Sequence, residues 1–406
     1  MDLREKRNAL LELDLCDRCL GRQFAMLGHG LENYERGAIA RTVENLKEDS
    51  FVDRNVPETD PTGEECPLCC GLFENLEEYV DQVIRALEPY EIRTLLLGTR
   101  LPEEIERAEE KIWEDFGKKN AEPTKTELNR LVGRKVQTRL GVEADFKRPD
   151  VNAILDLRDD RVELQVNSSF FHAKYNKYVR GIPQTVWYCK ECGGRGCAKC
   201  DYTGKKYQES VQEIIQERFL KSADAKEATF HGAGREDVDA RCFGRREFVL
   251  ELHDPRKRSL ALEDIQEKLN RSQAKVELFG VKETSKDKVK EIKEKKADKT
   301  YRAVVRLSGD ISEARMDKIS EVQGTIDQRT PKRVVHRRAD LVRERKVYWI
   351  HAEELCRGVL DITIKAEAGT YIKELISGDD GRTKPSVAGQ LGCMARCEKL
   401  DVLDID

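Results

Sequence analysis

A short glycine-bounded segment, residues 231–241 (HGAGREDVDAR), holds the side chains best suited to chemistry in this chain. Gly232 and Gly234 permit positive backbone φ angles, so the segment can fold tightly and present Asp237 at the mouth of a sheet. Arg235 can keep that carboxylate ionised and oriented through a charge-assisted hydrogen bond. An aspartate held in this way suits nucleophilic or general-base work. The alternative is a solvated turn, since 37% of the residues are charged.

The cysteines form a second pattern with a defined chemistry. Eight of the 13 cysteines fall into four Cys-x-x-Cys pairs, and each pair can place two thiolates on one metal ion. Four thiolates leave no open coordination position, so we predict two structural zinc sites, against the alternative of buried, redox-inert cysteines. The first predicted site consists of Cys16, Cys19, Cys66 and Cys69, and the second of Cys189, Cys192, Cys197 and Cys200.

Composition limits the class of protein. A chain of 406 residues is long enough for two or three domains. Its first residues match neither a signal peptide nor a transit peptide, and no apolar run approaches the roughly 18 residues of a membrane span. We therefore expect a cytoplasmic protein with no membrane contact. The net charge of −4 argues against a uniformly basic surface, yet basic clusters at 256–258, 332–338 and 343–346 can form a local groove for RNA.

Hydrophobic periodicity predicts the elements that must position these residues. Apolar residues alternate at 248–252, 301–307 and 360–366, which is typical of strands with one buried face. Two further strands are expected within 155–166, and amphipathic spacing predicts a helix over 262–269. Long strands mixed with helices predict the α+β class.

Residues 234–237 (GRED) resemble the Gly-Arg-Thr-Asp motif of TruA-type pseudouridine synthases. The longer string through residue 251 is similar to the tenth pseudouridine synthase family, archaeal and eukaryotic enzymes with an N-terminal RNA-binding THUMP region. The resemblance covers roughly residues 160–400, and the first cysteine pairs fit it as well. It implies a multidomain α+β protein with a mixed catalytic sheet and an active site in a cleft across that sheet. It also implies isomerisation of uridine to pseudouridine without an organic cofactor, with Asp237 as the catalytic carboxylate.

Two further strings extend the predicted active site through the same resemblance. Residues 299–303 (KTYRA) resemble the second family motif, which implies that Tyr301 stacks on the uracil and is the candidate for removing the C5 proton. Residues 369–373 (GTYIK) are similar to the Gly-Thr-Tyr-Ile-Arg string of TruB-type enzymes, whose basic residue pairs with the catalytic aspartate. Lys373 departs from this pattern, because lysine cannot form the planar bidentate pair of arginine. Either Arg235 or Lys373 can hold the aspartate, and we favour Lys373.

The pocket wall and the RNA contacts complete the predicted site. The stretch 391–400 resembles the last family motif, in which a leucine lines the uracil pocket; we assign Leu400, with Leu391 as the second candidate. Interleaved aromatic and basic side chains at 175–185 suit base stacking and phosphate contact, whereas a proline-containing linker is the alternative. Five basic side chains at 328–340 can follow an RNA backbone. The predicted substrate-binding residues are Arg235, Tyr371, Arg337, Arg338, Tyr178 and Arg180.

The resemblance also predicts a domain plan and a substrate. We expect a zinc module at 1–75, a THUMP-type RNA-binding domain at 76–186, a zinc knuckle at 187–206 and a pseudouridine synthase domain at 207–406. The chain is expected to be a monomeric tRNA pseudouridine synthase that modifies the TΨC loop of tRNA at positions 54 and 55, with position 55 favoured. The residues leave open whether Asp237 attacks covalently or removes a ribose proton.

Three other functions compete with this one. A non-catalytic, zinc-stabilised tRNA-binding protein is the strongest rival, and it would need neither Asp237 nor Tyr301. His351 and Glu353 match the His-x-Glu of zinc deaminases, but the required Pro-Cys-x-x-Cys does not follow them. A THUMP-bearing methyltransferase would require a glycine-rich nucleotide loop after a first strand, and none is present in the sequence.

Overall fold

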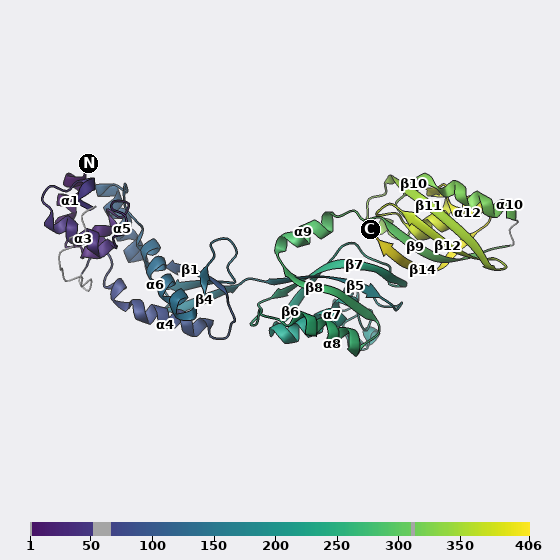
Figure 1. Ribbon diagram of the computed structural model, residues 1–406, viewed down its shortest axis with the longest axis horizontal. Coiled ribbons are helices and arrows are strands. Elements are labelled where there is room, and N and C mark those ends of the chain that lie inside the picture. The colour runs from purple at the N-terminus through teal and green to yellow at the C-terminus, as the bar shows by residue number, and fades with distance from the viewer. Residues whose placement is uncertain (1, 52–65, 310–312) are drawn as a thin grey trace. The chain divides into compact units, whose positions relative to one another are not determined.

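The fold is that of a computed structural model, which describes residues 2–51, 66–309 and 313–406. The chain forms two compact units (Figure 1), the first made of Met1–Ser168 with Arg256–Arg258 and the second of Ser169–Pro255 with Ser259–Asp406. Each unit has its own hydrophobic core. Within the described ranges, no helix is both long and apolar enough to span a bilayer.

The first unit combines a helical N-terminal part with a small sheet. Its sheet has the order β2-β1-β3-β4, in which β1 runs parallel to β2 and β3, and β3 runs antiparallel to β4. Val132 and Val136 on α6 pack on the buried face of β1, where Leu95 and Leu97 alternate with more exposed residues. The elements in chain order are α1 (Leu3–Leu11), α2 (Asp17–Arg22), α3 (Asn33–Thr42), η1 (Glu48–Phe51), η2 (Leu72–Asn75), α4 (Leu76–Leu87), β1 (Thr94–Arg100), α5 (Glu103–Phe116), α6 (Thr124–Leu140), β2 (Glu143–Ala144), β3 (Val151–Asp156) and β4 (Arg161–Val166).

The second unit is built on one large mixed sheet. In its described part the sheet has ten strands. Nine of them pair in the order β13-β10-β11-β12-β9-β14-β7-β5-β8, and the tenth, β6, pairs with the second half of β7. Only β14 and β7 run parallel among these described pairs. The strands are β5 (Ser169–Lys177), β6 (Glu227–Gly232), β7 (Ala240–His253), β8 (Val276–Thr284), β9 (Lys299–Leu307), β10 (Gly324–Arg329), β11 (Val342–Cys356), β12 (Val359–Ala366), β13 (Thr383–Lys384) and β14 (Ala395–Ile405).

Helices cover this sheet in two groups, so the second unit has two cores. Figure 1 shows α7 and α8 side by side beneath β5 to β8, and Phe219 of α7 packs against Phe171 of β5. A second core joins β9 to β12 and β14 with α11 and α12. The described helical segments are η3 (Ala198–Cys200), α7 (Val211–Ala223), α8 (Leu262–Ser272), α9 (Lys286–Glu294), α10 (Glu313–Met316), η4 (Asp317–Val322), η5 (Val335–Arg337), α11 (Ile372–Ser377), η6 (Asp379–Gly381) and α12 (Val387–Leu391).

Strand β7 belongs to both cores of the second unit. Its first residues, Ala240 and Cys242, pack with β9 and β14, whereas Phe248, Leu250 and Leu252 pack under α7 and α8. The loop that precedes β7 carries Asp237 and therefore lies where the two cores meet. This junction is the place at which the sheet can position residues from both halves of the unit.

The elements expected from hydrophobic periodicity are present. The alternating segments 248–252, 301–307 and 360–366 lie in β7, β9 and β12, and the pair expected within 155–166 corresponds to the ends of β3 and to β4. The amphipathic segment 262–269 forms most of α8. The α+β class expected from this mixture is confirmed.

The two compact units do not follow the bounds of the expected domain plan, which stays a prediction for its four separate domains. Residues 169–186, expected at the end of the RNA-binding domain, belong to the second unit, because β5 pairs with β7 on one side and β8 on the other. The expected zinc module at 1–75 shares a core with the small sheet. Buried Arg22 of α2 also links these two parts of the first unit, since its guanidinium lies 3.2 Å from Glu127 of α6.

The position of β5 predicts where the chain can be shortened. A chain that begins at residue 187 should lose cooperative folding, because it lacks a central strand and leaves β7 and β8 with unpaired edges. A chain that begins at residue 169 should fold cooperatively. Urea unfolding of both chains, followed by circular dichroism, measures the difference, and equal transitions would contradict the placement of β5.

Candidate active site

A buried cluster of charged and polar side chains holds the loop that carries Asp237. Glu236 is almost fully buried, and its two carboxylate oxygens each lie 3.0 Å from the hydroxyl of Tyr175, which donates to them. Nε of Arg246 lies 2.8 Å from the same carboxylate. Burial alone would lower the pKa of Arg246, but the charge of Glu236 outweighs it and raises that pKa. Glu236 is therefore bound to two neighbouring strands, β5 and β7.

Lys177 completes this cluster and contacts the loop backbone directly. Its ammonium donates to the carbonyl oxygens of Asp237 at 3.2 Å, Val238 at 3.4 Å and Ile182 at 3.1 Å. Its side chain is fully buried and lies 3.8 Å from Glu236. Burial lowers the pKa of Lys177, and the charge of Glu236 opposes that shift. We call Tyr175, Lys177, Glu236 and Arg246 the anchor cluster.

Two cations face the carboxylate of Asp237 from the other side of the loop. Nζ of Lys373 lies 3.1 Å from one carboxylate oxygen, and a guanidinium nitrogen of Arg333 lies 3.6 Å from the other. Lys373 also donates to both oxygens of Asp239 at 2.8 Å. The side chain of Asp237 is 34% exposed, so a substrate can reach it.

The same contacts set the protonation of Asp239 and Lys373. Burial would raise the pKa of Asp239, but the hydrogen bond and charge of Lys373 outweigh it and lower that pKa. Burial would lower the pKa of Lys373, and its hydrogen bonds with Asp239 and Asp237 raise it instead. Lys373 is therefore a stable cation, able to keep a neighbouring carboxylate ionised.

Arg333 is a site residue that the sequence motifs did not single out. It follows β10 in the basic segment 328–340, which we expected only to track an RNA backbone. Its Nε lies 2.6 Å from Glu374, which is almost fully buried, and its guanidinium lies 5.9 Å from the ring of Tyr371. The signal in the sequence was its membership of the basic segment, since nothing local distinguishes it from the neighbouring arginines.

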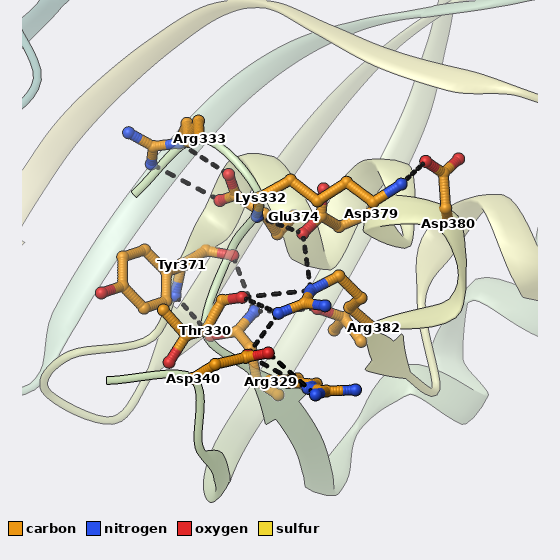
Figure 2. A network of polar contacts seen from close by, with 12 residues as sticks. Arg329, Thr330, Lys332, Arg333, Asp340, Tyr371, Glu374, Asp379, Asp380 and Arg382 are labelled. Carbon is orange, nitrogen blue, oxygen red and sulfur yellow. Dashed lines mark hydrogen bonds and ion pairs between the residues drawn. The ribbon is translucent and has the colours of Figure 1, made fainter. Parts of the chain in front are cut away.

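A polar network holds segment 329–340 in place (Figure 2). Arg382 donates to the carbonyl of Thr330 at 3.1 and 2.6 Å, and its guanidinium also pairs with Asp340. Arg329 reaches the same carboxylate at 2.8 Å. The two ends of the segment are thus joined through Arg382 and Asp340, which fixes the backbone from which Arg333 extends.

Tyr371 and Arg338, both expected to bind substrate, lie together beside this network. The side-chain amide of Gln328 binds the backbone of Tyr371 twice. The Tyr371 N–H donates to Oε1 of Gln328 at 2.7 Å, and Nε2 of Gln328 donates to the Tyr371 carbonyl at 3.0 Å. Arg338 donates to the Tyr371 hydroxyl at 2.8 Å. The side chain of Arg337 lies outside the described part of the chain.

Tyr301 and Leu400 provide the apolar face of the site. Leu400 pairs with Ala303 and Val402 pairs with Tyr301, so Tyr301 and Leu400 lie on the same face of the sheet. Both are nearly buried, at 9% and 7% exposure. Burial raises the pKa of Tyr301 to about 12, so its phenol is neutral near neutral pH. The second candidate, Leu391, ends α12 and is fully buried in the same core.

Three residues expected to contact RNA have protein partners in this structure. The guanidinium of Arg235 lies 4.6 Å from the ring of Trp187, while the cations on Asp237 are Lys373 and Arg333. Arg180 donates to the carbonyls of Asp239 and Leu400, both at 2.7 Å, and therefore ties the loop to β14. The hydroxyl of Tyr178 donates to Glu277. RNA contact by Arg235, Arg180 and Tyr178 stays a prediction.

The eight predicted metal ligands form two separate clusters of four. In each cluster the four sulfur atoms lie within 4.8 Å of one another. The sulfur atoms of Cys16 and Cys69 are 3.8 Å apart, and those of Cys197 and Cys200 are 3.7 Å apart. A tetrahedron with metal–sulfur bonds of about 2.3 Å has edges of about 3.8 Å. Both clusters therefore have the dimensions and the donor atoms of a closed four-thiolate metal site, and neither uses the adjacent, exposed Cys70.

The histidine considered for a deaminase has a different environment. His351 and Glu353 lie on β11, and each side chain is about 70% exposed. In the described ranges, the two cysteine clusters are the groups that could hold a metal, and neither His351 nor Glu353 belongs to them. The arrangement lacks the zinc centre that a deaminase requires.

Comparison with known proteins defines the class of this chain as a pseudouridine synthase with a THUMP domain. The family model described as "Pus10, C-terminal" matches residues 170–406, and "Pus10 THUMP domain, archaeal" matches residues 79–156. The chain belongs to the Pus10 family, which confirms the resemblance found in its motifs.

Several archaeal proteins named "tRNA pseudouridine synthase Pus10" are similar over nearly the whole chain. The protein of Methanothrix thermoacetophila is 39% identical, over 96% of this chain and 91% of its own. That of Methanothermobacter marburgensis is 41% identical, over 100% and 99%. That of Pyrococcus furiosus is 39% identical, over 100% and 98%.

The anchor cluster makes a stability prediction. Glu236→Gln should lower the free energy of unfolding by about 3–5 kcal/mol, because it leaves the buried cations of Arg246 and Lys177 uncompensated. Glu398→Gln is the matched control and should have little effect, since its ion pair with Arg306 is at the surface. Urea unfolding measures both variants, and a Glu236→Gln protein as stable as the control would refute the role of the cluster.

Proposed function

We propose that this protein isomerises uridine to pseudouridine in the TΨC loop of tRNA, at positions 54 and 55, with Asp237 as the catalytic carboxylate. The observation that carries the proposal is the environment of Asp237, an accessible aspartate beside Lys373 at 3.1 Å, near a sheet face that bears Tyr301 and Leu400. The names of the Pus10 relatives support tRNA as the substrate.

The reaction needs three groups in the site: a carboxylate, an aromatic ring that stacks on the uracil, and an apolar wall. The proposed residues supply all three. The N1–C1′ bond breaks, the uracil turns, and a C5–C1′ bond forms, after which the C5 proton leaves and N1 carries a proton instead. Because the product is an isomer, no organic cofactor is needed. A carboxylate supplies the group that attacks or removes a ribose proton, and Asp237 lies beside the cations of Lys373 and Arg333 for this role.

Tyr301 and Leu400 are proposed to enclose the flipped base. A base inside folded RNA must leave its stack before its ring can be turned, and it then needs a flat partner and an apolar wall. Tyr301 supplies the aromatic ring and Leu400 the wall. With a pKa of about 12, the Tyr301 phenol is neutral near neutral pH, which favours stacking over proton removal as its first role.

The two cysteine clusters are proposed to hold structural zinc. Four thiolates at tetrahedral separations form the donor set that zinc prefers, and they leave no coordination position open for substrate. Zinc would clamp the start of α2 to the turn at Cys66–Cys69, and it would close the short turn at 189–200. We further propose that the protein acts as a monomer in the cytoplasm.

Asp237 and its neighbour Asp239 provide a matched test of the catalytic role. Asp237→Asn should lower the rate of pseudouridine formation at least about a thousandfold, because the ionised carboxylate is lost. Affinity for tRNA should stay within a few-fold, since a carboxylate makes no favourable phosphate contact. Asp239→Asn should retain most of the activity. Carbodiimide mapping of an unmodified tRNA transcript measures both, and the reverse result would identify Asp239 as the catalytic group.

Metal content tests the zinc proposal. The purified protein should contain about two zinc ions per chain, and Cys16→Ser and Cys189→Ser should each lose one and lower the melting temperature. Cys70→Ser is the control and should keep both ions, because this cysteine lies outside the clusters. Atomic emission and thermal unfolding provide the two measurements. A Cys189→Ser protein that keeps two ions would disprove the second site.

A further inference from the structure

A cavity of about 350 Å³ opens beside the start of the catalytic loop in the second unit. Its walls are formed by Ala233 and Gly234, by the lysines at the end of α9 and after it, and by the turn at 368–369. Seven lysine and arginine side chains line it, against the three carboxylates of Glu247, Glu367 and Asp406. We call this cavity the basic pocket.

The carboxylates in the basic pocket neutralise its cations only in part. Glu247 lies 3.6 Å from Lys174 and 3.8 Å from Lys295, beyond hydrogen-bond distance in both cases. Glu367 lies 3.6 Å from Arg345. Asp406 is paired at 2.9 Å with Lys365, which does not line the pocket. The pocket therefore keeps an excess of positive charge.

Three further lysines of the pocket have no ion-pair partner in the described part of the chain. Lys293 and Lys296 are exposed at its rim, and Lys299 extends from β9 into its interior. The ammonium of Lys299 donates to the carbonyl of Ala297 at 2.6 Å. Burial lowers the pKa of Lys299 to about 8, the charge of Arg246 acts in the same direction, and the charges of Asp298 and Asp406 oppose the shift. A cation in this setting is stabilised by any anion that enters the pocket.

Gly369 shapes the wall that holds Arg345. Its φ of +85° lies in the left-handed region, and a Cβ atom there would meet the Arg345 guanidinium at 3.5 Å. A Cβ atom at that distance would be in ordinary contact, so it is the left-handed φ that favours glycine here, and the guanidinium beside the turn can bind phosphate oxygens with its flat group. The pocket thus combines the point charges of five lysines with the planar guanidinium groups of Arg245 and Arg345.

The basic pocket is formed partly by the same loop and the same strand as the proposed active site. Gly234 is in the same loop as Asp237, and Gly369 lies in the turn that leads into α11, which carries Lys373. Lys299 and Tyr301 are two residues apart on β9, so their side chains leave the same face of the strand about 6.6 Å apart. A ligand in the pocket would lie next to a nucleotide that stacks on Tyr301.

We propose that the basic pocket binds a backbone phosphate of the substrate RNA, next to the uridine that is modified. The proposal rests on the proposed function and names a part of the substrate that the site holds. A phosphodiester is favoured over a free phosphate or nucleotide, because the isomerisation consumes neither. Held phosphates position the strand without reading its sequence, so the pocket would fix the backbone while the base turns.

A pair of lysine variants with a matched control tests the pocket in the full-length protein. The test variant carries Lys293→Gln and Lys296→Gln, and the control carries Lys268→Gln and Lys290→Gln, two exposed lysines that do not line the pocket. Filter binding of a tRNA transcript across a salt series gives the slope of log affinity against log salt. Each lost phosphate contact reduces that slope by about 0.7–0.9. The test variant should lose about one contact more than the control and bind at least about fivefold more weakly.

A third variant and a second ligand complete the experiment. Lys293→Arg with Lys296→Arg should retain the slope of the unmodified chain, because either cation binds phosphate. Inorganic phosphate titrated by NMR should perturb the pocket residues of the unmodified chain only at millimolar concentrations. Equal slopes in the test variant and the control would overturn the proposal. Tight binding of inorganic phosphate with an unchanged tRNA slope would overturn it as well, and would assign the pocket to a free anion.

The binding assay does not depend on catalysis, so the proposed function and the proposed phosphate site can be disproved independently. If the unmodified chain makes no pseudouridine, the proposed function is wrong, whatever the salt slope. If the chain makes pseudouridine while the test variant binds tRNA with the slope of the control, only the phosphate site is wrong.

Discussion

The buried negative charge of Glu236 is the constraint on which the active site depends. An ionised carboxylate taken out of water costs several kcal/mol unless cations and hydrogen bonds compensate it. Arg246, Lys177 and Tyr175 supply that compensation from β7 and β5. Because these strands are neighbours in the sheet, their side chains converge on Glu236 and hold the loop beside them. Lys177 then binds the carbonyl of the next residue, so the position of the buried charge becomes the position of Asp237.

The two adjacent acidic residues of this loop thus have opposite surroundings. Glu236 points into the protein and is neutralised there, whereas Asp237 is 34% exposed and faces Lys373 and Arg333. The second half of the unit supplies both of these cations, one from α11 and one from the segment after β10. Strand β7 spans the two cores, so it joins the half that fixes the loop to the half that supplies its counter-ions. A carboxylate held between cations is the kind of preorganised charge that the proposed catalytic role of Asp237 requires.

Sequence periodicity predicted strands that have one buried face, and it made no prediction for β5. Strands β9 and β12 alternate regularly, because one face of each is packed and the other is exposed. In β5 both faces are largely covered, and residues such as Lys177 and Asn176 are buried through polar contacts instead of apolar ones. A run that mixes aromatic, basic and amide side chains in this way has no regular alternation that would predict a strand. Its role as a central strand follows only from pairing with β7 and β8, which are distant in the chain.

The sequence by itself determined the features that depend on local spacing. The four Cys-x-x-Cys pairs, the glycine-bounded loop with its aspartate and the strand carrying Tyr301 all follow from residues a few positions apart. The motif resemblance favoured Lys373 as the partner of Asp237, but only the tertiary structure added Arg333 there and placed Arg235 on the ring of Trp187. The reason is that an ion pair between distant residues depends on strand order and on the fixed backbone of two loops. Neither of these leaves a periodic signal in the sequence.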